Sequence, residues 1–395
     1  MRRLIPILGI TFVDIIGFSM LIPMLPYFVT HFGASAFVVG LIFATFSLCQ
    51  LLSAPLWGNI SDRVGRKFVL VTSQIGATIG WAMLAFSPNI TWVFIARIIE
   101  GVSGGNIGIT QAYVADLVAA KDRARAFSFI GATFGAGMIF GPVIGGVLFA
   151  KYGFKAPFLC AAGLQLLTLL LTLVFVPESR RREEREHVLL REAIQILRHP
   201  KMAYLLAQKL ALSLGLYGWY SASALYLQRQ LNFTLVDTDY FFAFFAILGV
   251  IMNVGAVGRT SKRIGDRAMS NVGFALLTLA FLVLPFVHSI AMLAGVLGVL
   301  FALGSALSQN GMTALISNSA RDREQGTILS VGSSLDSLSG IVAPPVSTGL
   351  LGAKGPAFAG VESTIFVIVA LVMGLSASLR ESREPKDAKA AGIKV

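Results

Sequence analysis

Long apolar runs alternate with short polar segments along the whole chain, and this alternation predicts the architecture. The apolar core of a bilayer is about 30 Å thick, and a helix of roughly 20 apolar residues crosses it. Twelve such runs are present in the 395 residues. The first six are 4–30, 36–58, 68–87, 90–118, 126–150 and 156–177, and the second six are 202–228, 238–258, 268–288, 290–318, 326–352 and 358–378. We therefore expect an all-α membrane protein with twelve transmembrane helices.

The polar segments of the first half recur in the second half. "GNISDRVGRK" at 58–67 is followed 200 residues later by "GRTSKRIGDR" at 258–267, and the segments that begin at Lys121 and Arg321 match at the same offset. Parallel repeats of six helices are typical of transporters whose binding cavity lies between two bundles and opens to each side in turn. We expect two pseudo-symmetric bundles and two further segments: an N-terminal bundle (1–177), a cytoplasmic linker (178–201), a C-terminal bundle (202–378) and a cytoplasmic tail (379–395).

Composition and charge support a membrane protein. The chain is 55% hydrophobic and 13% charged, whereas soluble domains carry about 25% charged residues. The net charge of +12 comes from short basic clusters between apolar runs, so no continuous basic face for nucleic acid is expected. Of the 32 Lys and Arg residues, those in loops on the side opposite the N-terminus are Lys151, Lys155, Arg229 and Lys354. Basic loops mark the cytoplasmic side, which predicts that both termini are cytoplasmic.

Several motifs of this chain resemble those of one transporter family. The loop at 58–67 fits the pattern Gly-x-x-x-Asp-Arg-x-Gly-Arg-Lys, and "GMIFGPVIGG" at 137–146 fits the pattern G-x-x-x-G-P-x-x-G-G. Further matches are Asp14 with Gly17, Pro23, Leu25 and Pro26 in the first span, and Arg97 with Gly101 in the fourth. On these motifs the chain resembles the major facilitator superfamily, and more narrowly its twelve-helix drug:proton antiporters, which include tetracycline exporters.

The resemblance implies a gate in the loop between the second and third spans. Asp62 would latch one bundle to the other on the cytoplasmic side and favour an outward-open state, with Arg63 and Arg66 taking part. Those basic residues could instead only determine topology. Two departures from the family pattern concern Glu100, where a glutamine is frequent, and Lys262, which stands where the first loop has Asp62.

Glycines are the other candidate gating residues. Gly58 and Gly65 allow close helix approach and a tight turn. In the fifth span Gly137, Gly141 and Gly145 recur every four residues and share one face, and Pro142 favours a bend. This face could gate access between the bundles or simply pack against a neighbouring helix.

Ionisable residues inside the spans point to proton coupling. A charge at mid-membrane costs roughly 2.5 to 3.5 kcal/mol on insertion scales, yet Asp14 and Glu100 both fall near that depth. Arg97 lies three residues before Glu100, which lets the two side chains pair on a helix. Loss of water favours a neutral carboxyl and a nearby Arg favours a charged one. We therefore expect Asp14 and Glu100, tuned by Arg97, to load and release a proton, against the alternative of a static ion pair.

Polar residues in apolar surroundings are candidates for the substrate cavity. Amides and a phenol could donate or accept hydrogen bonds from substrate, or could bond neighbouring helices instead. Asp336 and Lys209 could select substrates by charge. The cavity candidates are Asn106, Gln111, Gln208, Lys209, Tyr217, Gln309, Asn310 and Asp336.

No pattern in the sequence indicates an enzyme, a metal or a cofactor. Cys49 and Cys160 lie in apolar runs, the histidines are scattered, and the phosphate-loop pattern G-x-x-x-x-G-K-[ST] of ATP-driven pumps does not occur. The favoured interpretation is a secondary active transporter that exports amphipathic organic compounds in exchange for protons. It is expected to be monomeric, in the bacterial inner membrane, with a small-molecule substrate, protons and lipid as its partners. The alternatives are a facilitator or symporter for a sugar, organic anion or other metabolite, and a membrane sensor that has lost transport.

Overall fold

The computed structural model describes residues 5–104, 113–114, 123–178, 198–319 and 325–383, and every regular element within them is helical. In the first half these are α1 (Ile5–His31), α2 (Ala36–Val64), α3 (Arg66–Ala85), α4 (Ile90–Ser103), α6 (Arg123–Tyr152) and α7 (Lys155–Phe175). In the second half they are α9 (Pro200–Leu231), α10 (Leu235–Met252), η3 (Asn253–Val257), α11 (Gly258–Val283), η4 (Leu284–Phe286), α12 (Ile290–Met292), η5 (Leu293–Gly298), α13 (Val299–Asn318), α14 (Gln325–Lys354), η6 (Pro356–Phe358) and α15 (Val361–Arg383). The prediction of an all-α protein is therefore confirmed.

The predicted count of twelve spans is reproduced only in part. Each predicted span overlaps a helix, but eight helical segments of the described chain are long and apolar enough to cross a membrane. One of these segments runs over 52 residues and contains both α10 and α11. The segments that are not counted are α4, which has 14 residues, and α9 and α14, which carry more polar side chains.

The predicted span 90–118 is wrong as a continuous helix. α4 ends at Ser103, and Gly104 takes an extended conformation with ψ of 100°. Glycine is unfavourable in a helix interior because it loses the most backbone freedom there. Two glycines, Gly104 and Gly105, follow each other at this point of the sequence. A side chain of α2 bonds a backbone carbonyl at this helix end, since Ser53 Oγ donates to the Gly101 carbonyl at 3.1 Å.

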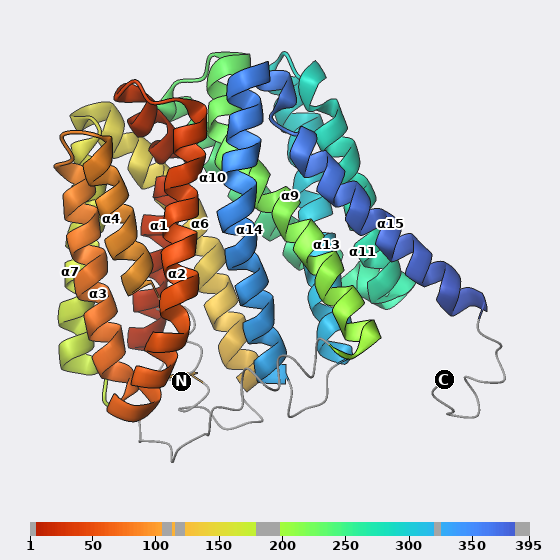
Figure 1. Ribbon diagram of the computed structural model, residues 1–395, viewed down its shortest axis with the longest axis horizontal. Coiled ribbons are helices and arrows are strands. Elements are labelled where there is room, and N and C mark those ends of the chain that lie inside the picture. Colours follow the sequence, from red (N-terminus) through yellow and green to blue (C-terminus); the bar gives the residue numbers. More distant parts are fainter. Residues whose placement is uncertain (1–4, 105–112, 115–122, 179–197, 320–324, 384–395) are drawn as a thin grey trace. The chain divides into compact units, whose positions relative to one another are not determined.

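Small residues bring the helices of the first half together, and Figure 1 shows them side by side. The packed pairs include α1 with α6, α3 with α7, α2 with α4, and α3 with α4. At the α3–α4 contact, a Cβ on Gly76 would lie 1.8 Å from Ser103 Oγ. Such close approach is how transmembrane helices gain packing energy without a hydrophobic drive between them.

The second half repeats two of these contacts. α11 packs against α13 and α15, as α3 packs against α4 and α7 in the first half. Glycines again face the partner helix: a Cβ on Gly273 would lie 2.4 Å from Ser308 N, and a Cβ on Gly304 would lie 2.9 Å from Leu277 N. The sequence repeat thus corresponds to a structural repeat at the third helix of each half.

The repeated loops contain the same turn with opposite charges around it. Gly65 (φ 117°) and Gly265 (φ 79°) both occupy the left-handed region that disfavours side chains. After the first turn Arg66 Nη1 donates to Ser61 Oγ at 2.9 Å, whereas in the second loop Ser261 Oγ donates to Asp266 Oδ1 at 2.6 Å. The predicted tight turn at Gly65 is confirmed. The two serines that match at the offset of 200, Ser61 and Ser261, bond a cation in the first half and an anion in the second.

Contacts divide the chain into two compact units that cut across the two sequence halves. The first unit is Met1–Val188, Tyr217–Ile247 and Ser337–Ala359, and the second is Leu189–Leu216, Leu248–Asp336 and Gly360–Val395. Parts of α9, α10 and α14 thus belong to the same unit as the helices of the first half. The division of the chain at 178–201 into two bundles remains a prediction.

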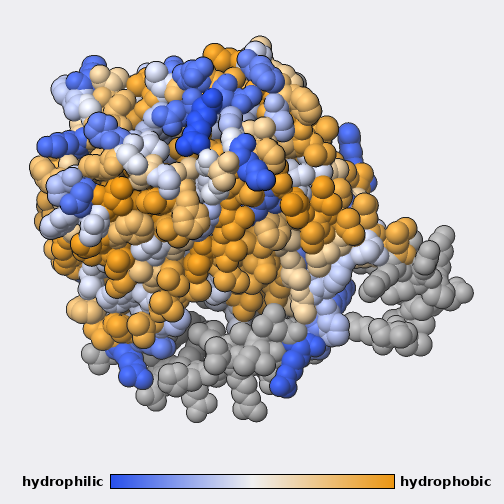
Figure 2. Space-filling model, turned by 45° about the horizontal axis from the view of Figure 1, so that its top comes forward, coloured by the Kyte–Doolittle hydropathy of each residue, from blue (hydrophilic) through white to orange (hydrophobic). Residues whose placement is uncertain are grey.

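The polarity of α7 is inverted relative to a soluble helix. Gln165, Thr168 and Thr172 are buried, while Leu170 and Val174 are 53% and 74% exposed. The Gln74 amide on α3 donates to Thr172 Oγ1 at 3.0 Å across the buried face. Exposed apolar residues also cover much of the visible face in Figure 2. A surface of this kind is stable in lipid, where apolar side chains face the tails and polar groups bond one another.

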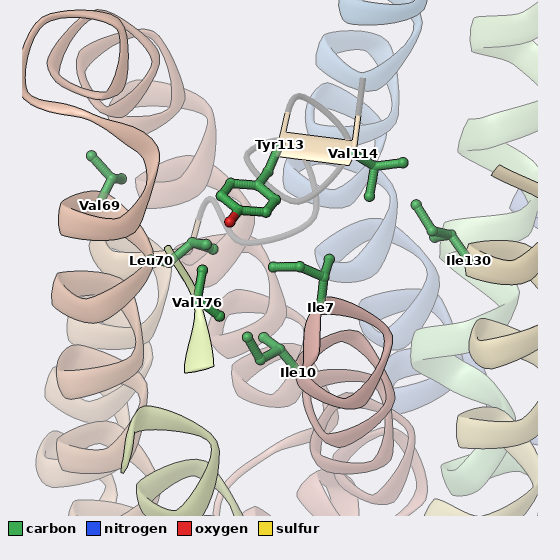
Figure 3. Packing of buried hydrophobic residues seen from close by; sticks show 8 residues of the cluster. All are labelled: Ile7, Ile10, Val69, Leu70, Tyr113, Val114, Ile130 and Val176. Carbon is green, nitrogen blue, oxygen red and sulfur yellow. The ribbon is translucent and has the colours of Figure 1, made fainter. Parts of the chain in front are cut away.

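A compact apolar cluster holds α1, α3 and α6 together near the start of α1 (Figure 3). Its aromatic member, Tyr113, is fully buried and donates a hydrogen bond of 2.8 Å to the Pro177 carbonyl. The cluster consists of Ile7, Ile10, Val69, Leu70, Tyr113, Val114, Ile130 and Val176.

Candidate functional site

An ion pair between Arg97 and Glu100 lies inside the first unit. Arg97 Nη1 contacts Glu100 Oε2 one turn along α4, and the side chains are 4% and 6% exposed. The Arg97 guanidinium also stacks over the Phe46 ring of α2, 4.4 Å from its centroid. The predicted pairing of these two residues is confirmed.

The sequence of α4 explains why the charges point inward. Its buried residues are Val93, Ala96, Arg97, Glu100 and Gly101, which recur at helical spacing. The opposite face carries exposed Trp92, Ile95, Ile98 and Val102. Because the apolar face is the one that suits lipid, α4 turns its two charges into the bundle.

The ion pair is packed tightly but is not fully satisfied. On α3, Gly80 makes room for the carboxylate stem, since a Cβ there would lie 2.3 Å from Glu100 Cγ. Glu100 Oε1 and Arg97 Nε are buried and have no hydrogen-bond partner among the described residues. A buried charge with open hydrogen-bonding capacity is costly. This pair is therefore a group that can gain a proton or a polar ligand.

Asp14 occupies a different environment from Glu100. It is half-buried on α1, whereas Glu100 is enclosed. One turn along α1, Gly17 lies against the ring of Trp81 on α3, where a Cβ would be 2.9 Å from Cζ2. Gly80, the neighbour of Trp81, faces Glu100. The turns of α1 and α4 that carry the two predicted carboxylates thus contact adjacent residues of α3, and Asp14 is the more exposed of the two.

A second ion pair joins two predicted residues of the second unit. Lys209 Nζ on α9 and Asp336 Oδ1 on α14 are 2.7 Å apart, and their side chains are 23% and 34% exposed. Ser213 Oγ, one turn from Lys209, donates to the same oxygen at 2.7 Å. Gly332 leaves space for the lysine stem, because a Cβ there would lie 3.2 Å from Lys209 Cε. The structure therefore combines Lys209 and Asp336 into one partly exposed group.

The other cavity candidates differ in their surroundings. Gln208 is 1% exposed and its amide donates to the Ala370 carbonyl of α15 at 2.9 Å, which favours the alternative of an interhelical bond. Asn310 is exposed and donates to Asn253 Oδ1 at 2.8 Å, and Gln309 beside it is exposed too. Tyr217 is half-buried near Gly340. Asn106 and Gln111 lie outside the described residues.

The glycine face of α6 packs against α1. A Cβ on Gly137 would lie 2.7 Å from Ile15 Cγ2, one on Gly141 would lie 1.9 Å from Ser19 Oγ, and one on Gly145 would lie 2.6 Å from Met20 Cγ. Ser19 Oγ also donates to the Gly137 carbonyl at 2.9 Å. Pro142 lies inside α6, which continues from Arg123 to Tyr152. The predicted backbone contact is present, and its part in gating remains a prediction.

The loop residues predicted to gate are arranged around α3. Gly58 has open space where a Cβ would stand, and Arg63 is exposed at the end of α2. Asp62 is on α2, and its side chain lies outside the described part of the structure. Glu178, which sequence reasoning did not single out, accepts a hydrogen bond of 3.1 Å from the Lys67 amide in the first turn of α3. Carboxylates are favoured at that position by the helix dipole.

Sequence reasoning also missed a group near the start of α10. Asp239 is 0% exposed, although it stands at the beginning of an apolar run and therefore resembles an ordinary helix-end residue. Next to it, the Thr238 hydroxyl and the Tyr27 hydroxyl of α1 are 2.7 Å apart. The spacing of 211 positions between the hydroxyl partners leaves no local signal in the sequence.

Comparison with known proteins agrees with this architecture. A family model described as the Major Facilitator Superfamily matches residues 7–344 and 255–393. The class C tetracycline resistance protein of Escherichia coli is 30% identical over 379 residues, which cover 94% of this chain and 95% of that protein. Multidrug resistance protein 2 of Bacillus subtilis (strain 168) is 27% identical over 346 residues, which cover 84% of each chain.

A solved structure is similar over nearly the whole chain as well. A bacterial homologue of the human lysosomal transporter Spinster, in an inward-facing and unoccupied conformation, matches with a TM-score of 0.81 and 16% identity. The match covers 95% of this chain and 96% of that one. At this identity the similarity shows the fold alone, but the family model and the curated relatives go further. The chain belongs to the Major Facilitator Superfamily of membrane transporters.

Proposed function

We propose that this transporter exports amphipathic organic compounds in exchange for protons, by alternating access between two six-helix bundles. The observation that carries the proposal is the buried and incompletely satisfied Arg97–Glu100 pair. Burying this ion pair in an apolar bundle is costly, and well-packed hydrophobic side chains of similar volume would stabilise the bundle at least as well. The similarity to tetracycline and multidrug resistance proteins supports export rather than uptake.

The proposed coupling is a competition for Glu100. While Glu100 is ionised it neutralises Arg97; when it gains a proton, the guanidinium loses its counter-charge and becomes costly in the enclosed site. That cost favours another arrangement of the bundle or another anionic partner. Asp14 is the more accessible carboxylate and serves as the group that exchanges protons with water.

The Lys209–Asp336 pair is assigned to substrate selection in the same proposal. Its partial exposure allows a charged substrate to displace one partner at modest cost, because water still screens the other. We further propose that the protein lies in the bacterial inner membrane with both termini cytoplasmic, on the basis of the basic loops.

The test is transport by purified protein in proteoliposomes with an imposed pH gradient. Antiport predicts that a lipophilic dye accumulates against the direction of proton flow, and that Glu100→Gln reduces the proton-driven rate at least about tenfold because the site can no longer exchange a proton. Asp14→Asn is expected to act in the same direction. Dye entry in the direction of proton flow would instead indicate a symporter.

The matched control is Glu178→Gln. It makes the same chemical change at a carboxylate that caps α3, and the amide oxygen still accepts the Lys67 hydrogen bond. This variant is expected to transport at the wild-type rate. Equal loss in Glu100→Gln and Glu178→Gln would mean that the charge matters for folding only, which would remove the proposed coupling.

A further inference from the structure

A second buried carboxylate lies on α10, away from the residues assigned to coupling. Asp239 is 0% exposed, and neither Oδ1 nor Oδ2 has a hydrogen-bond partner among the described residues. On α6 it lies against Gly146, where a Cβ would lie 3.0 Å from Asp239 Cβ and 3.2 Å from Oδ2. Both helices belong to the first compact unit at this point.

The lack of a partner is not a consequence of helix capping. The start of α10 is capped by Asp237, whose Oδ2 accepts from the Thr234 amide at 3.0 Å and from the Thr234 hydroxyl at 2.6 Å. Asp237 is exposed. The carboxylate that caps this helix end is therefore Asp237. Asp239 lies two residues later, is enclosed and takes no part in the cap.

The enclosure is made by contacts between the two sequence halves. Tyr27 of α1 is 8% exposed, and its hydroxyl donates to the Phe233 carbonyl at 2.9 Å and meets Thr238 Oγ1. Gly146 closes the site from α6 because it has no side chain to hold α10 away. All these residues are at helix ends that the sequence predicts to face the outer side.

We propose that Asp239 is a proton-binding site of an outer gate formed by the ends of α1, α6 and α10. The closed contact removes water from the carboxyl, and burial without a partner strongly disfavours the ionised carboxylate. The closed gate therefore holds the neutral acid, whereas separation of α6 from α10 hydrates the group and lets it ionise. The carboxylate takes up one proton from the outer solution on closing and returns it to the same solution on opening.

Within the described residues, the titratable groups that face Asp239 carry no positive charge. On α1 the titratable group that faces it is the Tyr27 phenol, and on α10 it is the acidic Asp237. On α6 it faces Gly146, which has no side chain. The basic residues nearest in sequence to these ends, His31, Lys151, Lys155 and Arg229, are exposed. External acid is therefore expected to favour the closed gate.

This inference rests on the proposed function for its role in transport, but its test does not require transport. The full chain with Cys49→Ser and Cys160→Ser receives spin labels at Tyr152→Cys and Arg229→Cys, both exposed at the outer ends of α6 and α9. Distances between the labels are measured in lipid nanodiscs at pH 5 and pH 8. The ratio of the short-distance to the long-distance population is expected to rise about tenfold on acidification, the effect of a tenfold difference in proton affinity between two states.

Asp239→Asn imitates the neutral acid and is the decisive variant. It is expected to populate the short distance at both pH values, with less than about a twofold change. Asp237→Asn makes the same change two residues away, keeps an oxygen for the Thr234 bonds, and is expected to respond like the unmodified chain. A wild-type response in Asp239→Asn would overturn the proposal.

A second variant covers the case in which Asp239→Asn does not fold. Thr238→Val removes the bond to Tyr27 but keeps the carboxyl, so the short-distance population should fall at both pH values while the response to pH persists. Loss of the response in Thr238→Val, with the fold intact, would also overturn the proposal. If the distances respond as expected and no compound is transported, the proton site stands and the proposed function fails.

Discussion

Single residues in this protein are informative where their burial contradicts their charge. Arg97 and Glu100 are enclosed together, Asp239 is enclosed alone, and Lys209 with Asp336 remains partly exposed. In the first environment the side chains are enclosed, so Glu100 can release Arg97 when it gains a proton. A charge in the last environment can exchange partners with a dissolved ligand. The same residue types therefore suit proton binding in one place and substrate binding in another.

The Lys209–Asp336 pair gives a prediction at the residue scale. Asp336→Asn leaves Lys209 with a net positive charge near the substrate path, so transport of a cationic dye should weaken several-fold more than transport of a neutral dye. Lys209→Gln should have the opposite preference. The measurement is KM for the two dyes in proteoliposomes.

The double variant Lys209→Gln/Asp336→Asn separates selection from stability. With both charges removed, the preference between dyes should return to near the wild-type value. Lys354→Gln, an exposed lysine at the end of α14, is the control and should change neither KM. Equal losses for both dyes in all three variants at the pair would assign it a structural role.

At the scale of elements, packing is decided by where glycines face. Gly141 approaches backbone atoms of α1, with a Cβ position 2.6 Å from the Ile16 carbonyl oxygen and 3.0 Å from Met20 N. Gly131 on the same helix has nothing within 4 Å of its Cβ position. The sequence places Gly141 on the face shared with Gly137 and Gly145 but does not say which helix this face meets, and the structure shows that it meets α1.

These two glycines give a prediction on stability. Gly141→Ala should destabilise the protein by about 1 to 3 kcal/mol, since backbone cannot move aside as a flexible side chain would. Gly131→Ala should be neutral or stabilise by less than about 1 kcal/mol through helix propensity. Thermal unfolding in one detergent measures both, and a lower Tm for Gly131→Ala than for Gly141→Ala would contradict the α1–α6 packing.

At the scale of the whole molecule, orientation in the membrane is still a prediction from basic loops. In a chain with Cys49→Ser and Cys160→Ser, a cysteine at Tyr152 should react with a membrane-impermeant maleimide added to intact cells. A cysteine at Lys262 should react only after permeabilisation. Both positions are exposed, so access to the reagent depends on the side of the membrane. Reversal of this pattern would invert the proposed topology.

The duplicated architecture sets what the sequence could and could not predict at this scale. The offset of 200 residues anticipated equivalent turns, and Gly65 and Gly265 both have positive φ. It did not anticipate that parts of α9, α10 and α14 would group with the first half. A repeat specifies which elements are alike, whereas contacts between repeats depend on side chains that the two copies do not share.

The sequence by itself determined the helical membrane fold, the repeated turns, the family and the Arg97–Glu100 pairing, because hydropathy, glycine conformation and i, i+3 spacing are local properties. The tertiary structure decided the rest. It ended α4 at Ser103, joined Lys209 to Asp336 across 127 positions, turned Gln208 towards α15 and enclosed Asp239 beside Gly146. Burial and partnership are set by which helices meet, and no local pattern records a contact between residues that are distant along the chain.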